Sequence, residues 1–117
     1  MRKFRVNTIP NGIPVVIHCN QFETGDTWKF VIFSGDERYN IPAGATVKFQ
    51  GTKSNKETFT ISCTVSNNEV LVTVTDDITS SGGKCIAEIY IKSGDVNVYT
   101  ANMLIAVEDT AGSEDES

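Results

Sequence analysis

The side chains that could take part in catalysis are few and are spread along the chain. One histidine, His18, lies in the apolar run 15–19, whereas a general base needs its reaction partner within hydrogen-bond reach. The three cysteines, Cys19, Cys63 and Cys85, form no Cys-x-x-Cys pair, and one imidazole with isolated thiols does not make a zinc site. We therefore expect His18 to be a partly buried, hydrogen-bonded structural residue. We expect Cys63 and Cys85 to be buried as small hydrophobic residues in a reduced protein.

Calcium needs only oxygen ligands, and two groups of carboxylates come near to providing them. Asp76-Asp77 is followed by Ser80-Ser81, and Glu23 lies near Asp26. Neither group has the Asp-x-Asp-x-Asp spacing of a dedicated calcium loop, and helix capping and turn formation account for both. No glycine-rich phosphate loop occurs. The sequence therefore predicts no catalytic residues, no metal and no cofactor, and a protein that is not an enzyme.

A sugar-binding protein without such groups needs exposed aromatic side chains. The segment 27–33 is apolar on both of its faces, which predicts a buried central strand and not a sugar-binding shelf. The remaining candidates are three tyrosines: Tyr39, Tyr90 and Tyr99. Tyr99 shares its face of the alternation with Met103 and Ile105, which predicts that it points into the core. A glycan site therefore stays an alternative that no pattern indicates.

The elements that carry these side chains are strands, because apolar and polar residues alternate from about residue 13 to residue 107. We expect strands at 13–19, 27–33, 38–39, 45–50, 57–65, 70–75, 84–92 and 96–107. The turns at 66–69 and 93–95 predict hairpins, and one short helical turn is expected within 76–83, begun by Asp76 or Asp77. The fold class is all-β: an antiparallel β-sandwich of Ig-like architecture, with about eight or nine strands.

Length and charge divide the chain into three parts. A chain of 117 residues is one domain, and we expect an extended N-terminal arm at 1–12, the sandwich at 13–108, and an acidic disordered tail or linker start at 109–117. Five of the fifteen acids lie at 108–116, so ten acids balance the ten bases in the rest of the chain. No basic patch for nucleic acid or an anionic membrane is indicated, and no apolar run reaches the roughly 20 residues of a membrane span.

Several strings of residues go beyond generic strand patterning. They are Asn20-Gln21-Phe22-x-x-Gly25-Asp26-Thr27, Tyr39-Asn40-Ile41-Pro42-Ala43-Gly44-Ala45-Thr46-Val47, Gly51-Thr52-Lys53, Asp77-Ile78-Thr79-x-x-x-Gly83, Ala87-Glu88-Ile89-x-Ile91, Thr100-Ala101-Asn102 and Val107-Glu108. Over roughly residues 13–110, the chain resembles the N-terminal domain of the baseplate upper protein family of tailed phages of Gram-positive bacteria. The Ile-Pro-x-Gly-Ala-Thr-Val block with the following Gly-Thr-Lys is the most specific part of the likeness.

The resemblance implies a non-enzymatic structural role in a phage or prophage. Such a domain anchors a baseplate or tail-fibre receptor-binding assembly to the tail, so its partners would be a hub protein and copies of itself in a trimer. The protein would be made in the bacterial cytoplasm and located in the virion, and it would be either part of a longer chain or a short stand-alone form. The matched residues that we interpret as fold determinants are Gln21, Gly25, Pro42, Gly44, Ala45, Val47 and Gly51.

The basic N-terminal segment is our candidate for the contact with the partner. Its residues are Arg2, Lys3, Phe4 and Arg5, and an extended arm can add a strand to the edge of a neighbour's sheet. Two other interpretations remain open: a first strand of the sandwich itself, or a frayed terminus. The alternative function is a β-sandwich carbohydrate-binding module that recognises cell-wall glycan, with Tyr39 or Tyr90 exposed in a shallow groove.

Overall fold

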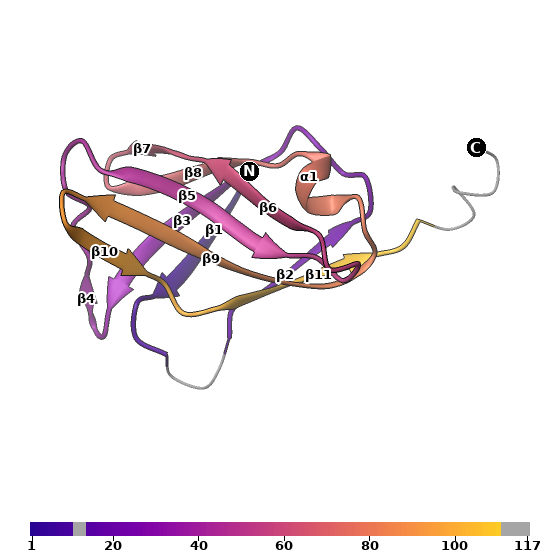
Figure 1. Ribbon diagram of the computed structural model, residues 1–117, viewed down its shortest axis with the longest axis horizontal. Coiled ribbons are helices and arrows are strands. Elements are labelled where there is room, and N and C mark those ends of the chain that lie inside the picture. The colour runs from indigo at the N-terminus through magenta and orange to yellow at the C-terminus, as the bar shows by residue number, and fades with distance from the viewer. Residues whose placement is uncertain (11–13, 111–117) are drawn as a thin grey trace.

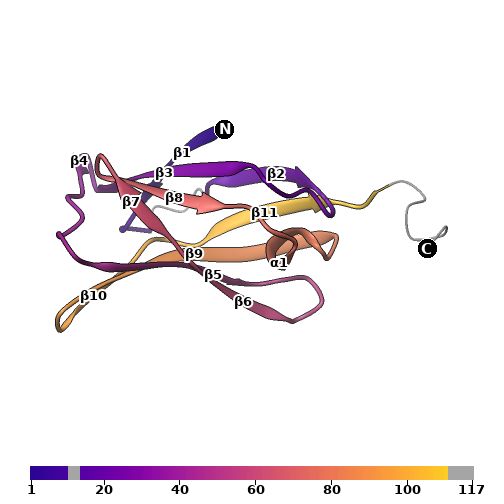
Figure 2. The same ribbon diagram turned by 90° about the horizontal axis from the view of Figure 1, so that it is seen from above.

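The computed structural model describes residues 1–10 and 14–110, and this part of the chain folds into two β-sheets packed face to face (Figure 1). Seen from above, β3 and β8 lie in one layer and β5 and β9 in the other (Figure 2). The end of the predicted N-terminal arm, residues 11–12, lies outside the described residues, as does the predicted acidic tail beyond Thr110.

Sheet 1 has the strand order β1-β3-β8-β7, and the two-residue strand β4 pairs with β3 beyond the end of β8. Its strands are β1 (Arg2–Asn7), β3 (Thr27–Ser34), β4 (Glu37–Arg38), β7 (Thr64–Ser66) and β8 (Glu69–Thr73). Sheet 2 has the order β2-β11-β9-β5-β6, with β10 also paired to β9. Its strands are β2 (Val16–Asn20), β5 (Thr46–Thr52), β6 (Thr58–Ser62), β9 (Gly83–Ser93), β10 (Val96–Tyr99) and β11 (Met103–Glu108).

The predicted all-β sandwich is confirmed, but two details of the prediction are wrong. The described residues form eleven strands, more than the eight or nine expected. The sheets are mixed and not purely antiparallel, because β1 runs parallel to β3 and β2 runs parallel to β11. Hairpins enforce antiparallel pairing, and neither of these pairs is joined by a hairpin. Side-chain alternation shows which face of a strand is buried but not the direction of its neighbour.

The core lies between the sheets and is built from the inward side chains of each strand. The central strand β3 places Trp28 and Phe30 there, 1% and 0% exposed, and the ring of Phe30 stacks on that of Phe49 of β5 at 5.5 Å. The prediction that 27–33 is a central strand is confirmed, and its inward face is buried; on the opposite face Val31 is buried, whereas Lys29 and Phe33 are half-buried. At roughly 2–3 kcal/mol for each large apolar side chain, these rings stabilise the packing of the two layers.

One predicted strand, 57–65, is in fact divided between the two sheets. Residues 58–62 pair with β5 in sheet 2, whereas 64–66 pair with β8 in sheet 1, and Cys63 lies at the crossing. The hairpin that follows is confirmed: Asn67 and Asn68 have φ angles of 53° and 61°, the left-handed conformation that this turn requires.

The predicted strand 96–107 contains a one-residue bulge. Tyr99 faces Tyr90 and Met103 faces Ala87, so residues 100–102 lie opposite only two residues of β9. The hydroxyl of Thr100 accepts a hydrogen bond from the backbone N–H of Ile89 at 2.9 Å and completes the pairing there. An extra residue reverses the faces of the strand. The prediction that Tyr99 points into the core is therefore wrong, and the residue is 49% exposed.

The predicted helical turn is present as α1 (Asp76–Thr79). Its N-cap residue is Thr75, whose side chain makes no capping hydrogen bond, so the prediction that Asp76 or Asp77 begins the helix as its cap is wrong. Both aspartates instead occupy the first turn, where negative charge favours the exposed N–H groups. The described residues contain no helix long and apolar enough to cross a membrane.

Candidate interaction surface on strand β1

The predicted contact segment forms the edge strand β1 and lies within sheet 1. Each of its residues pairs in parallel with β3, from Arg2 opposite Trp28 to Asn7 opposite Phe33. On its other side β1 has no strand partner among the described residues. Because successive side chains point to opposite faces of a strand, the four predicted contact residues are divided into two pairs, one inward and one outward.

The inward pair belongs to the core. The ring of Phe4 meets Trp28 edge-on at 6.2 Å and stacks on Phe30 at 5.5 Å. The guanidinium of Arg2 lies 5.6 Å from the ring centre of Phe4 and 5.5 Å from that of Trp28. Such cation–π contacts stabilise by about 0.5–1 kcal/mol at partly exposed sites. Arg2 and Phe4 therefore close the end of the core at the edge of sheet 1.

The outward pair lies on the solvent face of sheet 1. The guanidinium of Arg5 lies 3.7 Å from the ring centre of Phe33. The ammonium of Lys3 contacts Glu69 of β8 at 2.6 Å, and that of Lys29 lies 3.8 Å from the same carboxylate. The hydrogen bond from Lys3 is the main cause of a pKa of Glu69 below its ordinary value, with further contributions from the charges of Lys3, Lys29 and Arg38.

We call this surface the basic face and define it by Lys3, Arg5, Lys29, Arg38 and Glu69. Arg38 joins it from β4, where it lies opposite Phe33 and donates a hydrogen bond to the backbone carbonyl of Asn68 at 2.8 Å. The face has four positive charges and one negative charge, and the side chain of Lys3 is 59% exposed. Its chemistry suits a partner surface that is acidic or rich in carbonyl oxygens.

Three members of the basic face, Lys29, Arg38 and Glu69, were not predicted from the sequence. Lys29 and Arg38 lie far from residues 2–5 in the chain, and only the pairing of β3 with β1 and β4 brings them together. One signal was present, because Lys29 shares its face of the alternation with Val31 and Phe33. A lysine on an otherwise apolar face of a strand indicates that this face meets solvent.

The residues of the resemblance motif gather at turns and at one end of the sandwich. Gly44 has a φ of 78°, and the carbonyl of Pro42 accepts a hydrogen bond from the N–H of Ala45 at 3.2 Å. Ala45 packs against the core, and Val47 is 3% exposed within it.

Two glycines of the motif occupy positions with special backbone requirements. Gly25 has a φ of 89° and donates its N–H to the carbonyl of Val74 at 2.9 Å. At Gly51 a Cβ atom would collide with the backbone carbonyl of Ile86 and would lie 2.9 Å from the ring of Phe59. Only a residue without a side chain fits at Gly51 without a shift of β9 or of that ring.

Polar side chains tie the end of the sandwich near α1 together. Gln21 donates to the carbonyl of Ser80 at 2.9 Å and accepts from the N–H of Thr110 at 3.3 Å. Lys53, only 7% exposed, donates to the hydroxyl of Ser80 at 3.0 Å and pairs with Glu57 at 3.2 Å. These contacts hold the ends of β2, β5 and the chain after β11 against the helical turn.

The residues considered for chemistry are brought together only in part: His18, Cys19, Glu23 and Asp26 line one open hollow beside β2, and Cys63 does not. His18 is exposed on the outer face of β2, so the prediction that it is partly buried and hydrogen-bonded is wrong. Cys85 is 2% exposed, as predicted, whereas Cys63, also predicted to be buried, is only half-buried at the sheet crossing. Partial burial raises the pKa of the Cys63 thiol to about 12. Such a thiol carries almost no thiolate at neutral pH and is a poor nucleophile.

The carboxylates Glu23 and Asp26, which were considered for calcium, have other contacts. Glu23 accepts a hydrogen bond from the backbone N–H of Asn20 at 2.8 Å, and Asp26 accepts one from Thr27 at 2.8 Å. In the described part of the chain no group of three or more histidine, cysteine, aspartate or glutamate side chains is placed to hold a metal ion. These carboxylates act in turns, which is the interpretation that the sequence favoured.

Comparison with known proteins finds a similar fold but no family. No protein family matches the chain, and no curated protein matches it in sequence. Among solved structures, the chain is similar to the N-terminal domain of phage TP901-1 ORF48, with a TM-score of 0.68 and 16% sequence identity. The likeness covers 92% of this chain and 99% of that one. At this level of identity the likeness shows that the two domains share a fold.

Proposed function

We propose that this chain is a non-enzymatic structural domain of a phage or prophage virion. It anchors a baseplate or tail-fibre receptor-binding assembly to the tail. The observation that carries the proposal is the fold shared with an N-terminal domain of a phage protein over nearly the whole of both chains. The motif block 39–53, which resembles the baseplate upper protein family, supports the same role.

The contact with the tail is proposed for the basic face and not for a free arm. Lys3 and Arg5 project outward from the edge strand β1, whereas Phe4 between them packs inward. A rigid strand presents its charges in a fixed geometry, so less entropy is lost on binding than with a flexible segment. The partner is a hub protein of the tail whose surface is acidic, and the complete protein assembles as a trimer, so that weak contacts add up.

The first experiment asks whether the protein is in the particle. Particles are induced and purified, and the protein is detected by immunoblot and by immunogold electron microscopy with an antibody against the complete protein. Label at the tail tip supports the proposal. Purified particles that lack the protein on a denaturing blot, which also detects occluded subunits, refute it.

The second experiment tests the basic face. The double variant Lys3→Ala/Arg5→Ala is expected to reduce incorporation into particles by about tenfold, since two interface charges of this kind contribute roughly 1–2 kcal/mol together. The matched control is Lys84→Ala/Lys92→Ala, which removes two exposed bases from the outer face of sheet 2. Equal incorporation of both double variants would remove the basic face from the interface.

A further inference from the structure

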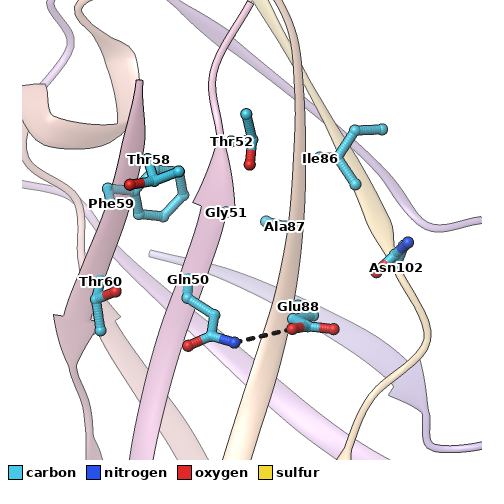
Figure 3. A pocket seen from close by; sticks show the side chains of 10 residues that line it. All are labelled: Gln50, Gly51, Thr52, Thr58, Phe59, Thr60, Ile86, Ala87, Glu88 and Asn102. Carbon is cyan, nitrogen blue, oxygen red and sulfur yellow. Dashed lines mark hydrogen bonds between the residues drawn. The ribbon is translucent and has the colours of Figure 1, made fainter. Parts of the chain in front are cut away.

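The outer face of sheet 2 contains a shallow hollow of about 330 Å³ that the anchoring role does not use. Figure 3 shows its lining from β5, β6 and β9 and from the bulge between β10 and β11. The lining residues are Gln50, Gly51, Thr52, Thr58, Phe59, Thr60, Ile86, Ala87, Glu88 and Asn102. Five of the ten are uncharged and polar, and Glu88 is the only ionisable side chain among them.

Gly51, Ala87 and Phe59, whose side-chain positions face the core, form the floor of the hollow. Gly51 lies in the middle of β5, opposite Ala87 of β9 on one side and Phe59 of β6 on the other. The side chains on both sides of Gly51 along β5, Gln50 and Thr52, point outward and form walls. The missing side chain of Gly51 would point inward against Phe59, so the glycine serves the packing of the core, and the hollow is bounded by the outward side chains of its neighbours.

The polar side chains of the hollow include a hydrogen-bonded pair that still has donors and acceptors available for a ligand. The amide nitrogen of Gln50 donates to a carboxylate oxygen of Glu88 at 2.8 Å. This leaves the amide oxygen, one amide N–H and the second carboxylate oxygen to a ligand. Within the described part of the chain the side-chain amide of Asn102 has no hydrogen-bond partner. A dense set of donors and acceptors of this kind matches a ligand whose hydroxyls both donate and accept.

An aromatic pair lies next to the hollow on the same face. Tyr90 follows Glu88 by two residues on β9, a separation of roughly 7 Å along the strand. Its ring stacks on that of Tyr99 at 4.8 Å with 26° between the planes, and its hydroxyl donates to Asn97 at 2.8 Å. Tyr99 is 49% exposed, so much of its ring remains open to solvent. An aromatic face of this kind packs well against the C–H groups of a pyranose ring.

The charge of the hollow favours an uncharged ligand over one that contains phosphate. The hollow holds one carboxylate and no base. Lys48 lies opposite Tyr90 on β5, but it is half-buried beside the aromatic pair and does not line the hollow. A polymer with a phosphate on each repeat unit would meet the carboxylate of Glu88 without a cation to bind it.

We propose that the hollow and the Tyr90–Tyr99 pair together bind an uncharged glycan, with the sugar ring on Tyr99 and its hydroxyls on Gln50, Glu88 and Asn102. The site lies on the outer face of sheet 2, whereas the basic face lies on the outer face of sheet 1. The two proposals are therefore independent, and a virion domain with both would hold the tail on one side and contact the cell wall on the other.

The test is a ¹H–¹⁵N NMR titration of the isotopically labelled chain. The probes are soluble neutral polysaccharide from the walls of a Gram-positive bacterium and, separately, the phosphate-containing polymer from the same walls. The neutral polysaccharide is expected to shift the amide signals of residues 50–52, 58–60, 86–90 and 99–102. Shifts confined to other residues, or binding of the phosphate-containing polymer alone, would overturn the proposal, as would a spectrum unchanged at millimolar sugar.

Variants separate stacking from hydrogen bonding. Tyr99→Ala is expected to weaken binding by about tenfold, whereas Tyr99→Phe, which keeps the ring, stays within about twofold of the parent. Asn102→Ala provides a second loss of about fivefold at a position outside the core. Lys3→Ala/Arg5→Ala is the matched control, and it leaves glycan binding unchanged. If Tyr99→Ala and Asn102→Ala both bind like the parent, the site is wrong, whatever the outcome for incorporation into particles.

Discussion

Phe4 decides whether β1 is a part of the sandwich or an arm that can leave it. Its ring stacks on Phe30 at 5.5 Å and meets Trp28 edge-on at 6.2 Å, and its side chain is half-buried. Fully burying an aromatic side chain removes roughly 150–250 Å² from water, so burying half of it at about 25 cal/mol/Å² contributes about 2–3 kcal/mol. The two ring pairs add about 1 kcal/mol. Phe4→Ala is therefore expected to lower the free energy of unfolding by about 3 kcal/mol.

The assay is equilibrium unfolding in guanidinium chloride, followed by the fluorescence of Trp28, the only tryptophan in the chain. A loss of about 3 kcal/mol corresponds to a fall in Tm of roughly 9–15 °C for a domain of this length. The control is Lys3→Ala on the same strand, which removes an exposed ion pair and is expected to cost less than about 1 kcal/mol.

Equal stabilities of Phe4→Ala and Lys3→Ala would refute the assignment of β1 to the cooperative fold. The strand would then be a detachable arm, and addition to the edge of a neighbour's sheet would become the better account of the contact. A loss near 3 kcal/mol would leave the outward side chains of an ordered β1 as the contact.

Two further predictions concern Gly51 and Glu69. Gly51→Ala is expected to cost about 1–3 kcal/mol in urea unfolding because its Cβ would collide with Ile86 and Phe59, whereas Gly94→Asn, at a φ of 59° with open space around it, stays near neutral. Equal free energies of unfolding for Gly51→Ala and Gly94→Asn would contradict the close contact of Gly51 with Ile86 and Phe59. The pKa of Glu69 lies below its ordinary 4.5 in the folded state, so its stabilising contribution is complete above about pH 4.5 and is lost as the pH falls through the lowered pKa. Glu69→Gln should therefore flatten the fall in urea midpoint between neutral pH and about pH 3, and an unchanged slope would contradict the ion pair.

The sequence predicted the buried face of most strands because that property is local. Val47 and Phe49, Trp28 and Phe30, and the Asn67-Asn68 turn each follow from residues two positions apart or adjacent. The division of 57–65 between two sheets did not follow, because the alternation continues through Cys63 while the hydrogen-bond partner changes from β5 to β8. The alternation of apolar and polar residues along a strand does not show that its hydrogen-bonding partner strand has changed.

Because strand pairing could not be predicted from the sequence, the full set of residues on the basic face could not be predicted either. Residues 2–5 were identified by charge, which is visible in the sequence, but their division into an inward and an outward pair depends on β1 being a strand of sheet 1. Glu69 and Arg38 join Lys3 and Arg5 only through β8 and β4, which lie many residues away in the chain. A surface built from four strands is a property of the pairing, and pairing was the part of the fold that the alternation did not determine.

Tyr99 shows what one unpaired residue can change. Counting by twos from Met103 placed its ring in the core, and the count fails because residues 100–102 hold one residue more than their partners on β9. The bulge is stabilised by Thr100. Its buried hydroxyl accepts a hydrogen bond from the N–H of Ile89, which the interrupted backbone pairing leaves without a strand partner. A threonine between two alternating runs is too common to have indicated this. Its consequence is that Tyr99 leaves the core face and stacks on Tyr90 beside a polar hollow. The bulge that made the prediction for Tyr99 wrong therefore creates the aromatic surface on which the proposed glycan site depends.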